Sequence, residues 1–564
     1  MEKRSIRSVR FIAAERSAEE LASVAPEVSF SGPDGAPDVA ELASDYLARV
    51  LEQDAVMSFG PDAEPSPEVA LRDVQPSRLT GTSVVRFDQV RSSIPIFGSH
   101  MVVEVAASGA LVGVQADVAA VQGTSPIPTV TPEAAMASIA ALAGVDAAAL
   151  QAPAAPTLTF FHEDDEDADR WHLAWFFKDV PVEPAHEPSR CRGHGGSPRR
   201  SMPRYDYLVD AHGGEVVFYY STAPRARGPA IPIKCTGSDE LGVAQEFFGQ
   251  AVAGGFELSD PMRRLKTFDL AGGDISVEPI ALPKAPLRSE AAEFPAKHRA
   301  AVSAHVNVGR VLDFYRTVLM RDSVDDKGME IESIVNCISS GDDTPPNWSN
   351  AVWWNGRMWY GQIHGPNGEV RSFSAFLDVI AHELTHGVIE SSANLIYKGE
   401  SGALNESLCD IFGVIIGNWY RVGADSDPGG WSWEFGPGLG DDGKPIRDLA
   451  DPSRTGDPAS MTDYVRTRED EGGVHSNSNI HNKAAYHLLT AEDSQGRRRV
   501  TAREAAILYY LCLVRLPQRA GFARALRGLL DVATTYFAGD AAERDRKLAA
   551  IRAAYKKVGV TLAD

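Results

Sequence analysis

The sequence predicts a multidomain α+β protein, in which an N-terminal α+β region precedes a β-rich lobe and a helical lobe. Its 564 residues are more than one hydrophobic core usually holds, so several domains are expected. Alternating apolar and polar residues indicate strands before about residue 375, whereas apolar residues at helical spacing dominate the last part of the chain. The fold class rests on this length and on this change of period.

The first part of the N-terminal region is expected to combine an extension with a small module. Residues 1–60 form the extension, with one amphipathic helix from Val39 to Val56 in otherwise loosely ordered sequence. Residues 61–125 form the first module, because alternation in 82–87 and again in 99–105 predicts a β-hairpin.

Residues 126–225 are expected to form a second module of helix and sheet. An alanine-rich helix from Thr131 to Leu142 is followed by strand-like runs at 171–177 and 205–211. A generic α+β domain is the alternative, since fold does not fix function.

Residues 226–380 and 381–564 are expected to form the two remaining lobes. In the β-rich lobe, Phe268 to Val277 and Val352 to Ile363 are strand-like, and a helix is expected from about Ala296 to Met320. The helical lobe has apolar residues at helical spacing in Ser478 to Leu489, Ala502 to Val514, Phe522 to Phe537 and Asp545 to Val558.

The strongest indication of chemistry lies in residues 382–406. His382 and His386 are four positions apart, so on a helix they project from one face and can bind one metal ion. Glu406, on the next predicted helix, completes a set of two imidazoles and a carboxylate, which leaves a position open for water on a zinc ion. Glu383 lies beside the ligands, off their face. The pattern predicts a catalytic zinc site.

An ordinary polar helix face is the alternative, because this spacing also occurs by chance. The preceding residues Val379 to Ala381 are apolar and predict a mostly buried helix, in which unpartnered histidines would be costly. Asp410, one turn after Glu406, is the candidate to accept the second ring N–H of a ligand histidine, and Asn405 is a weaker candidate.

With these residues the chain resembles a thermolysin-type zinc metallopeptidase, and the resemblance extends beyond the metal motif. Asn350 and Ala351, which open the run NAVWWNG, match the family's edge strand, where an extended peptide substrate is held. Further along the chain, Tyr397 matches the family's transition-state tyrosine and Arg447 its substrate-carbonyl arginine. The run DEGGVHSNS, residues 470–478, supplies His475 as the catalytic histidine and Asp470 as the carboxylate that orients it.

The resemblance implies a zinc-dependent neutral endopeptidase with two catalytic lobes and the zinc site in the cleft between them. Glu383 would be the general base that takes a proton from the zinc-activated water. Tyr397 and a protonated His475 would stabilise the oxyanion. A pocket implying cleavage before bulky apolar residues would be lined by Val379, Phe435 and Ile446.

Residues 1 to about 225 resemble the family's propeptide modules, so the chain is expected to be a proenzyme inhibited by its own prosegment. The matching runs in the first module are Val85 to Val90 and Ile94 to Gly98. An exposed maturation linker is expected at Ser221 to Pro229, and a second cleavage site in the loop from Glu187 to Arg204.

Family members commonly hold two calcium ions beside the active site, and this chain departs from that pattern. Asp378 and Glu434 are retained, but Gly417, Ser432 and Pro437 stand at the other matching positions. Because calcium takes about six to eight oxygen ligands, the double calcium site is expected to be lost.

Composition excludes several classes of protein. A net charge of −22 argues against nucleic-acid binding, which needs a basic surface. The best candidate for a membrane span, Ala505 to Leu516, is too short and contains Arg515. Five scattered cysteines predict no disulfide framework. A monomer is expected. The resemblance favours secretion although no signal peptide is visible, with a cytoplasmic location as the alternative.

Two other functions remain as alternatives, a zinc aminopeptidase and an inactive zinc-binding scaffold. Gly328-Met329-Glu330 only partly matches the aminopeptidase substrate motif, and it lacks that motif's spacing and final asparagine. Both Glu383 and His475 are present, which argues against an inactive scaffold.

Overall fold

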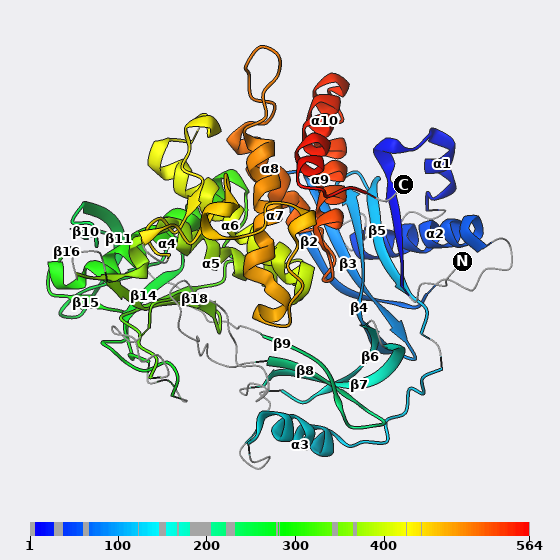
Figure 1. Ribbon diagram of the computed structural model, residues 1–564, viewed down its shortest axis with the longest axis horizontal. Coiled ribbons are helices and arrows are strands. Elements are labelled where there is room, and N and C mark those ends of the chain that lie inside the picture. The colour runs from blue at the N-terminus through cyan, green and yellow to red at the C-terminus, as the bar shows by residue number, and fades with distance from the viewer. Residues whose placement is uncertain are drawn as a thin grey trace.

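The computed structural model describes residues 6–26, 38–59, 67–121, 123–145, 150, 154–165, 168–180, 205–221, 232–277, 280, 282–340, 348–364, 369–424, 426–440 and 443–562. These residues form an N-terminal region, a β-rich lobe and a helical lobe, which confirms the predicted α+β organisation. In Figure 1 the N-terminal region runs from blue to cyan, the β-rich lobe is mainly green, and the helical lobe runs from yellow to red.

One nine-stranded sheet runs through the N-terminal region, in the order β1-β5-β4-β6-β7-β8-β9, with β3 paired to β4 and β2 to β3. Its strands are β1 (Ile6–Ile12), β2 (Val69–Ser77), β3 (Thr82–Arg91), β4 (Ile94–Ala106), β5 (Leu111–Ala119), β6 (Thr157–Asp165), β7 (Ala168–Val180), β8 (Tyr205–Asp210) and β9 (Val216–Ser221). The predicted hairpin is confirmed as the antiparallel pair of β3 and β4. A single parallel contact between Ile96 and Phe160 joins β4 to β6.

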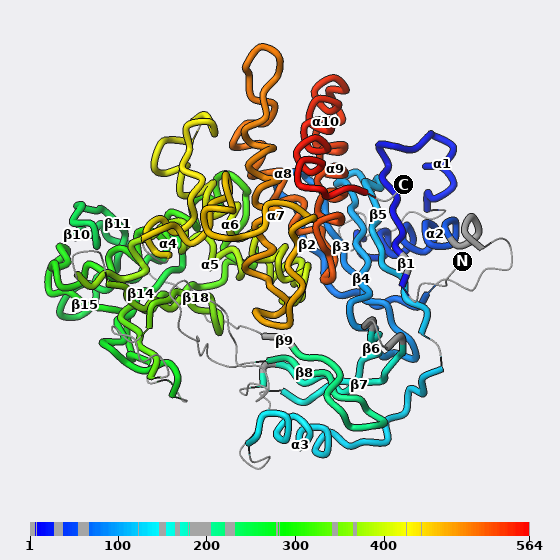
Figure 2. Tube along the Cα trace, in the orientation of Figure 1, coloured from blue at the N-terminus to red at the C-terminus, as the bar shows by residue number. Residues whose placement is uncertain are grey.

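Strand β4 divides its side chains between two opposite faces, as the period of two along a strand requires. Met101, Val103 and Val105 are buried in one cluster with α2 (Val39–Phe59). Val102 and Glu104 face the other side, where α9 (Phe522–Tyr536) of the helical lobe lies. This part of the sheet is therefore covered by a helix from each end of the sequence, seen in Figure 2 as blue and red segments beside the same strands.

The expectation that residues 1–60 are loosely ordered outside the amphipathic helix is wrong for residues 6–23. Strand β1 pairs antiparallel with β5, and α1 (Ala18–Ser23) follows it. Val9 and Phe11 are buried in the core, whereas Arg10 points away from it and pairs with Asp531. The basic side chain has a partner 521 positions away, which local sequence does not reveal.

Helix α3 (Pro132–Ala143) packs on β8 and β9 and confirms the alanine-rich helix of the second module. Its N-cap is Thr131, whose hydroxyl accepts a hydrogen bond from the Ala134 N–H, and Pro132 occupies the first helical position. Ile139 of this helix is buried beside Tyr207 and Val209.

The β-rich lobe contains two five-stranded sheets, in the orders β15-β12-β11-β10-β16 and β13-β14-β17-β19-β18, and α4 (Arg299–Val318) contacts strands of both. The strands are β10 (Ile233–Ser238), β11 (Ala244–Val252), β12 (Gly255–Glu257), β13 (Ser259–Asp260), β14 (Leu265–Asp269), β15 (Arg288–Ser289), β16 (Glu293–Phe294), β17 (Ile331–Val335), β18 (Ala351–Trp354) and β19 (Arg357–Tyr360). The short pair β20 (Gln362–His364) and β21 (Val370–Ser372) follows. Strand β18 lies at the edge of its sheet.

The expected strand from Phe268 to Val277 is wrong in length. Strand β14 ends at Asp269, because Ala271 and Gly272 adopt positive φ angles of 52° and 80° that turn the chain. Beyond this turn, Asp274 forms an isolated β-bridge with Ile338.

The helical lobe confirms every helix that periodicity predicts. Its helices are α5 (Leu377–Glu390), α6 (Gly399–Val422), α7 (Asp470–Leu489), α8 (Ala502–Leu513), α9 and α10 (Ala541–Lys557), with the short pair β22 (Glu434–Phe435) and β23 (Arg447–Asp448) between α6 and α7. Helices α5, α6 and α7 pack against one another in the core that carries the metal motif.

Two further expectations concern the cleavage sites and membrane-spanning helices. The cleavage loop at 187–204 and all of the linker after Ser221 lie outside the described residues. Within the described residues, no helix combines the length and apolar character that crossing a bilayer requires.

Candidate functional site

The predicted metal ligands come together where α5 packs on α6. His382 and His386 lie one turn apart on α5, and their Nε2 atoms are 3.1 Å from each other. Glu406 reaches them from α6, with Oε1 3.3 Å from Nε2 of His386 and Oε2 3.5 Å from Nε2 of His382. Two nitrogens and a carboxylate therefore point at one position.

This triangle of atoms fits a zinc ion. Tetrahedral zinc with bonds of about 2.0 to 2.1 Å separates its ligand atoms by roughly 3.3 Å, and the observed separations scatter around that value. Glu406 is only 1% exposed, and a carboxylate buried so deeply requires a cation or several donors. Two imidazoles and one carboxylate form the donor set of catalytic rather than closed structural zinc sites.

The outer nitrogen of each ligand histidine meets an oxygen from α6. Nδ1 of His382 lies 2.9 Å from Oδ1 of Asp410, and Nδ1 of His386 lies 2.9 Å from Oδ1 of Asn405. An oxygen in this position can accept the Nδ1–H, the arrangement that turns Nε2 of each histidine toward a metal ion.

Cys409 also touches this site, although its sequence context suggests an inert core residue. Its Sγ atom is 3.3 Å from Nδ1 of His386, and His382, His386 and Cys409 are close enough to be considered together as a metal site. The thiol faces Nδ1, however, on the opposite side of the ring from the Nε2 triangle. Burial raises the pKa of the Cys409 thiol to about 12. It does not complete the zinc ligand set.

Glu383 is held against the edge strand of the β-rich lobe. Its Oε2 accepts a hydrogen bond of 2.9 Å from the backbone N–H of Trp353 on β18. Asn350 lies just before this strand, and Ala351 is its first residue. The Asn350 carbonyl oxygen accepts the Gly361 N–H. The structure thus places the predicted base next to the predicted substrate strand.

Tyr397 and His475 flank the ligand carboxylate on its other side. The Tyr397 hydroxyl donates to Oε1 of Glu406 at 2.5 Å and lies 3.2 Å from Nε2 of His475. Asp470 accepts the Nδ1–H of His475 at 2.5 Å and its backbone N–H at 2.9 Å. Burial alone would lower the pKa of His475, but the charges of Asp470 and Glu406 raise it, which favours the imidazolium.

The first turn of α7 has an unusual backbone that positions Asp470. Four successive residues, Asp470 to Gly473, have φ angles of 55°, 51°, 92° and 75°. Such angles are costly for aspartate and glutamate. A Cβ atom at Gly472 would lie 3.0 Å from the Gly399 Cα. The glycine pair in the sequence was the only signal for this turn.

Arg447 lies deep in the site, bound to Asp410. Its Nε and Nη2 atoms each donate to the Asp410 carboxylate at 2.6 Å, and Nη2 is 3.4 Å from Oε2 of Glu406. Its guanidinium carbon also lies 4.9 Å from the centre of the Phe435 ring. The three residues expected to line the apolar pocket, Val379, Phe435 and Ile446, are 3%, 3% and 9% exposed.

Sequence reasoning missed a second set of buried polar residues on α7. Asn482 donates to Oδ2 of Asp410 at 2.8 Å. Its neighbour His481 lies between Ser407 and Tyr555, and burial lowers the pKa of His481 to about 3, so it is neutral. These contacts tie α7, which carries His475, to α6.

At the positions where a calcium pair was expected to be lost, protein groups contact the remaining carboxylates. Asp378 accepts the Gly436 N–H at 2.8 Å. Arg454 pairs with Glu434 at 2.9 Å and also contacts Asp448.

Comparison with known proteins gives matches along most of the chain. Models of the thermolysin metallopeptidase catalytic domain and alpha-helical domain match residues 234–390 and 393–560. A model of the fungalysin/thermolysin propeptide motif matches residues 68–118.

Relatives of this chain come from several bacteria. Bacillolysin of Bacillus cereus is 30% identical over 389 residues, which are 64% of this chain and 64% of that protein. Neutral protease B of Bacillus subtilis (strain 168) is 32% identical over 371 residues, 63% of this chain and 62% of that protein. An extracellular elastase of Staphylococcus epidermidis is 32% identical over 315 residues, 55% of this chain and 56% of that protein. The chain thus spans less than two thirds of the length of these relatives.

A solved structure of the precursor of protealysin, a metalloproteinase from Serratia proteamaculans, is 29% identical, with a TM-score of 0.42 over 53% of this chain and 87% of that chain. The two peptidase models together run from residue 234 to residue 560 with a gap of two residues, and the propeptide motif precedes them. The chain belongs to the thermolysin family of metallopeptidases and carries that family's propeptide motif.

Proposed function

We propose that the chain is a zinc-dependent endopeptidase, made as a proenzyme, with Glu383 as its general base. One observation carries the proposal: α5 presents the ligands His382 and His386 and, between them, a base that hydrogen-bonds the edge strand β18. The metal position and the strand on which a peptide would lie are thereby joined by one helix.

Zinc held by His382, His386 and Glu406 would polarise the scissile carbonyl and lower the pKa of a water molecule in its open position. Glu383 takes a proton from the attacking water as the new C–O bond forms. It then delivers that proton to the amine nitrogen as the C–N bond breaks, which yields a carboxylic acid and an amine. Asn350 and the backbone of β18, which begins at Ala351, hold the peptide as an added strand.

Tyr397 and His475 stabilise the oxyanion of the tetrahedral intermediate. Asp470 keeps His475 charged and aimed, and each donor of this kind is commonly worth about 3 to 4 kcal/mol. Asp410 and Asn405 fix the ligand histidines. The contacts of Arg447 support a role in holding Asp410 in addition to the substrate-carbonyl role that the family resemblance assigns to it.

Residues up to about 225 act as the prosegment that inhibits the enzyme. The propeptide motif at 68–118 supports this assignment. The boundaries at 60, 125, 225 and 380 remain predictions. Cleavage before bulky apolar residues also remains a prediction.

The protein binds one catalytic zinc ion and no calcium pair, a proposal supported by Arg454, which pairs with Glu434 and contacts Asp448. It functions as a secreted monomer, with support for secretion from the relative named an extracellular elastase.

The test is incubation of purified, processed protein with casein and with an aminoacyl chromogenic substrate, with and without a metal chelator. Chelator-sensitive cleavage of casein is expected. Turnover of the aminoacyl substrate alone would instead identify an aminopeptidase, and turnover of neither substrate after prosegment removal would identify an inactive scaffold.

A further inference from the structure

We propose that the surface formed by α9 and the segment after α8 is a recognition site for the prosegment, separate from the catalytic centre, and that the buried pair of Glu104 and Arg515 selects the matching prosegment. This docking surface comprises Val514, Arg515, Arg524 and Asp531. The inference rests on the proposed function, because it takes the N-terminal region to be the inhibitory prosegment.

Polar contacts of both charge signs cross the docking surface. They join Glu104 to Arg515, Asp117 to Arg524 at 2.6 Å, Arg10 to Asp531 at 2.8 Å, and Arg86 to the carbonyl oxygen of Val514 at 2.6 Å. Because each side carries both cations and anions, only one arrangement of the two parts satisfies every contact.

The pair of Glu104 and Arg515 is enclosed and fully bonded. The Arg515 and Glu104 side chains are only 9% and 11% exposed. Nε of Arg515 donates to Oε2 of Glu104 at 2.9 Å, Nη2 contacts Oε1, and Nη1 donates to the Leu511 carbonyl oxygen at 2.8 Å. Thr82 donates a further hydrogen bond of 2.5 Å to Oε1 of Glu104. Burial alone would raise the pKa of Glu104, but Arg515 lowers it, so the carboxylate is charged.

This burial gives the pair its selectivity. When the prosegment is absent, Arg515 loses the sheet that covers it and is hydrated, so an unpaired charge costs little. When a prosegment without a carboxylate at this position docks, it buries Arg515 without a partner, which is strongly unfavourable. The pair therefore disfavours a mismatched prosegment more than it stabilises the matched one.

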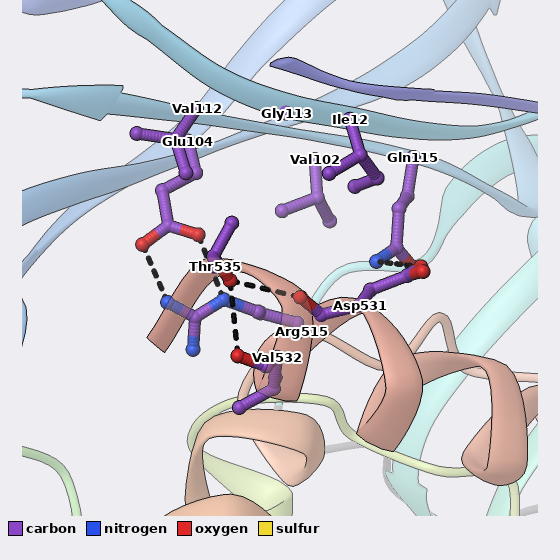
Figure 3. A pocket seen from close by; sticks show the side chains of 10 residues that line it. All are labelled: Ile12, Val102, Glu104, Val112, Gly113, Gln115, Arg515, Asp531, Val532 and Thr535. Carbon is purple, nitrogen blue, oxygen red and sulfur yellow. Dashed lines mark hydrogen bonds and ion pairs between the residues drawn. The ribbon is translucent and has the colours of Figure 1, made fainter. Parts of the chain in front are cut away.

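The apolar part of this interface is less specific. Beside the pair, a pocket remains between the sheet and α9, and its lining includes Val102, Gly113, Val532 and Thr535 (Figure 3). The lining also includes Glu104, Gln115, Arg515 and Asp531. Because the pocket leaves apolar contact between the sheet and α9 incomplete, the charge pairs define the register.

A second contact brings the prosegment beside the catalytic tyrosine. Ile396, which precedes Tyr397, is buried in a cluster with Phe97 and Phe161 of the N-terminal region. Nζ of Lys398 lies 5.0 Å from the centre of the Tyr219 ring. Docking at α9 thus positions this second contact next to the active site, although the docking surface itself contributes no candidate catalytic residue.

The experiment uses the full chain carrying Glu383→Ala, which prevents self-digestion, with a site for a specific protease inserted between residues 222 and 231. After cutting, the dissociation constant of the two parts is measured. Arg515→Glu and Glu104→Arg should each raise it by about 100-fold or more, because each leaves like charges buried together. The double variant, which restores the pair with reversed polarity, should return to within about tenfold of the parent.

Arg497→Glu is the matched control, because Arg497 forms an exposed pair with Asp493 away from the docking surface and is 73% exposed. It should change binding by less than about twofold. The proposal is overturned if Arg515→Glu binds as tightly as the parent, or if the double variant is no tighter than the single ones. If Arg515→Glu fails to fold, Glu104→Gln in the prosegment should still weaken binding by at least about tenfold.

Failure of this inference and failure of the proposed function are distinguishable. Binding of the cut parts is measured without turnover. For the second measurement, Arg515→Glu is introduced into the chain that retains Glu383, and the prosegment is digested away. Peptide hydrolysis by this variant should match that of the parent whatever the binding result.

Discussion

The carboxylate of Asp410 holds Arg447 through two hydrogen bonds of 2.6 Å each. The same carboxylate accepts the Nδ1–H of His382 and an N–H of Asn482, so four donors from three other elements meet at one buried side chain. Burial would raise the pKa of Asp410, but Arg447 and His382 lower it, and the charge is retained. Asp410 thus ties His382, one of the proposed metal ligands, to β23 and α7 of the helical lobe.

Asp410→Asn should weaken zinc binding and destabilise the fold. The amide leaves Arg447 without its closest charged partner, and breaking a buried pair costs about 3 to 5 kcal/mol. Zinc affinity should fall by about 10- to 100-fold, as for other groups that orient ligand histidines. Competition with a chromophoric chelator and thermal unfolding of the zinc-loaded protein measure the two effects. Asn482→Ala, which removes one neutral donor from the same carboxylate, should cost only about 1 kcal/mol; equal effects of both variants would contradict this account.

Gly472→Ala should reduce activity more than it reduces stability. The new Cβ atom meets Gly399 at 3.0 Å, so the turn that presents Asp470 to His475 has to shift. Loss of an oxyanion donor costs about 100- to 1,000-fold in kcat. Gly496→Ala is the control, because φ at Gly496 is also positive, at 73°, but nothing lies within 4 Å of its Cβ position. That variant should lose about 1 kcal/mol of stability and keep its kcat.

Stability of the N-terminal region should fall as pH rises above about 6.5, the ordinary pKa of histidine. His172 on β7 is buried and both ring nitrogens meet carboxylates, Asp210 at 2.5 Å and Glu163 at 3.0 Å, so both contacts are satisfied only by the imidazolium. Burial lowers the pKa of His172 but these carboxylates raise it, with Arg170 opposing them.

A pKa raised in the folded state means that the contribution of His172 is complete below the unfolded pKa and is lost as pH rises through the folded value. The unfolding midpoint of this region in the Glu383→Ala chain should therefore drop between pH 6 and pH 9. His172→Gln should show a smaller drop over the same range. An identical pH dependence in the two proteins would show that His172 does not cause the drop.

Calcium removal should leave the protein unchanged. The two acidic residues that remain at the expected calcium positions already have protein partners, because Arg454 pairs with Glu434 and Asp378 accepts the Gly436 N–H. After calcium is stripped and zinc restored, the midpoint of thermal unfolding should move by less than about 2 °C. A rise of several degrees on adding calcium, absent with magnesium, would show that a calcium site persists.

Local patterns predicted much of this molecule. The helices at 502–513 and 522–536 follow directly from apolar spacing, and His382, Glu383 and His386 lie within one helical turn of each other, so their geometry is encoded locally. Strand β18 and its place at a sheet edge were predicted because the run that begins at Asn350 resembles the edge strand of the family.

What sequence reasoning missed depends on distant partners or on unusual backbone. Arg10 and Asp531 are separated by 521 positions, and Arg515 and Glu104 by 411, so neither residue signals its partner locally. The left-handed run from Asp470 to Gly473 contradicts the usual backbone preference of Glu471, its second residue. Cys409 looks like a core residue in sequence, and only packing places its sulfur on His386.

The most direct test of the central claim compares zinc content and peptide hydrolysis in the parent enzyme and Glu383→Gln, both freed of their prosegment. Both proteins should bind one zinc ion, because Glu383 is not a ligand, while hydrolysis of an internally quenched peptide should fall by at least about 100-fold in Glu383→Gln, in which the general base is lost. Glu383→Gln that retains zinc and cleaves the peptide at the parent rate would contradict the claim.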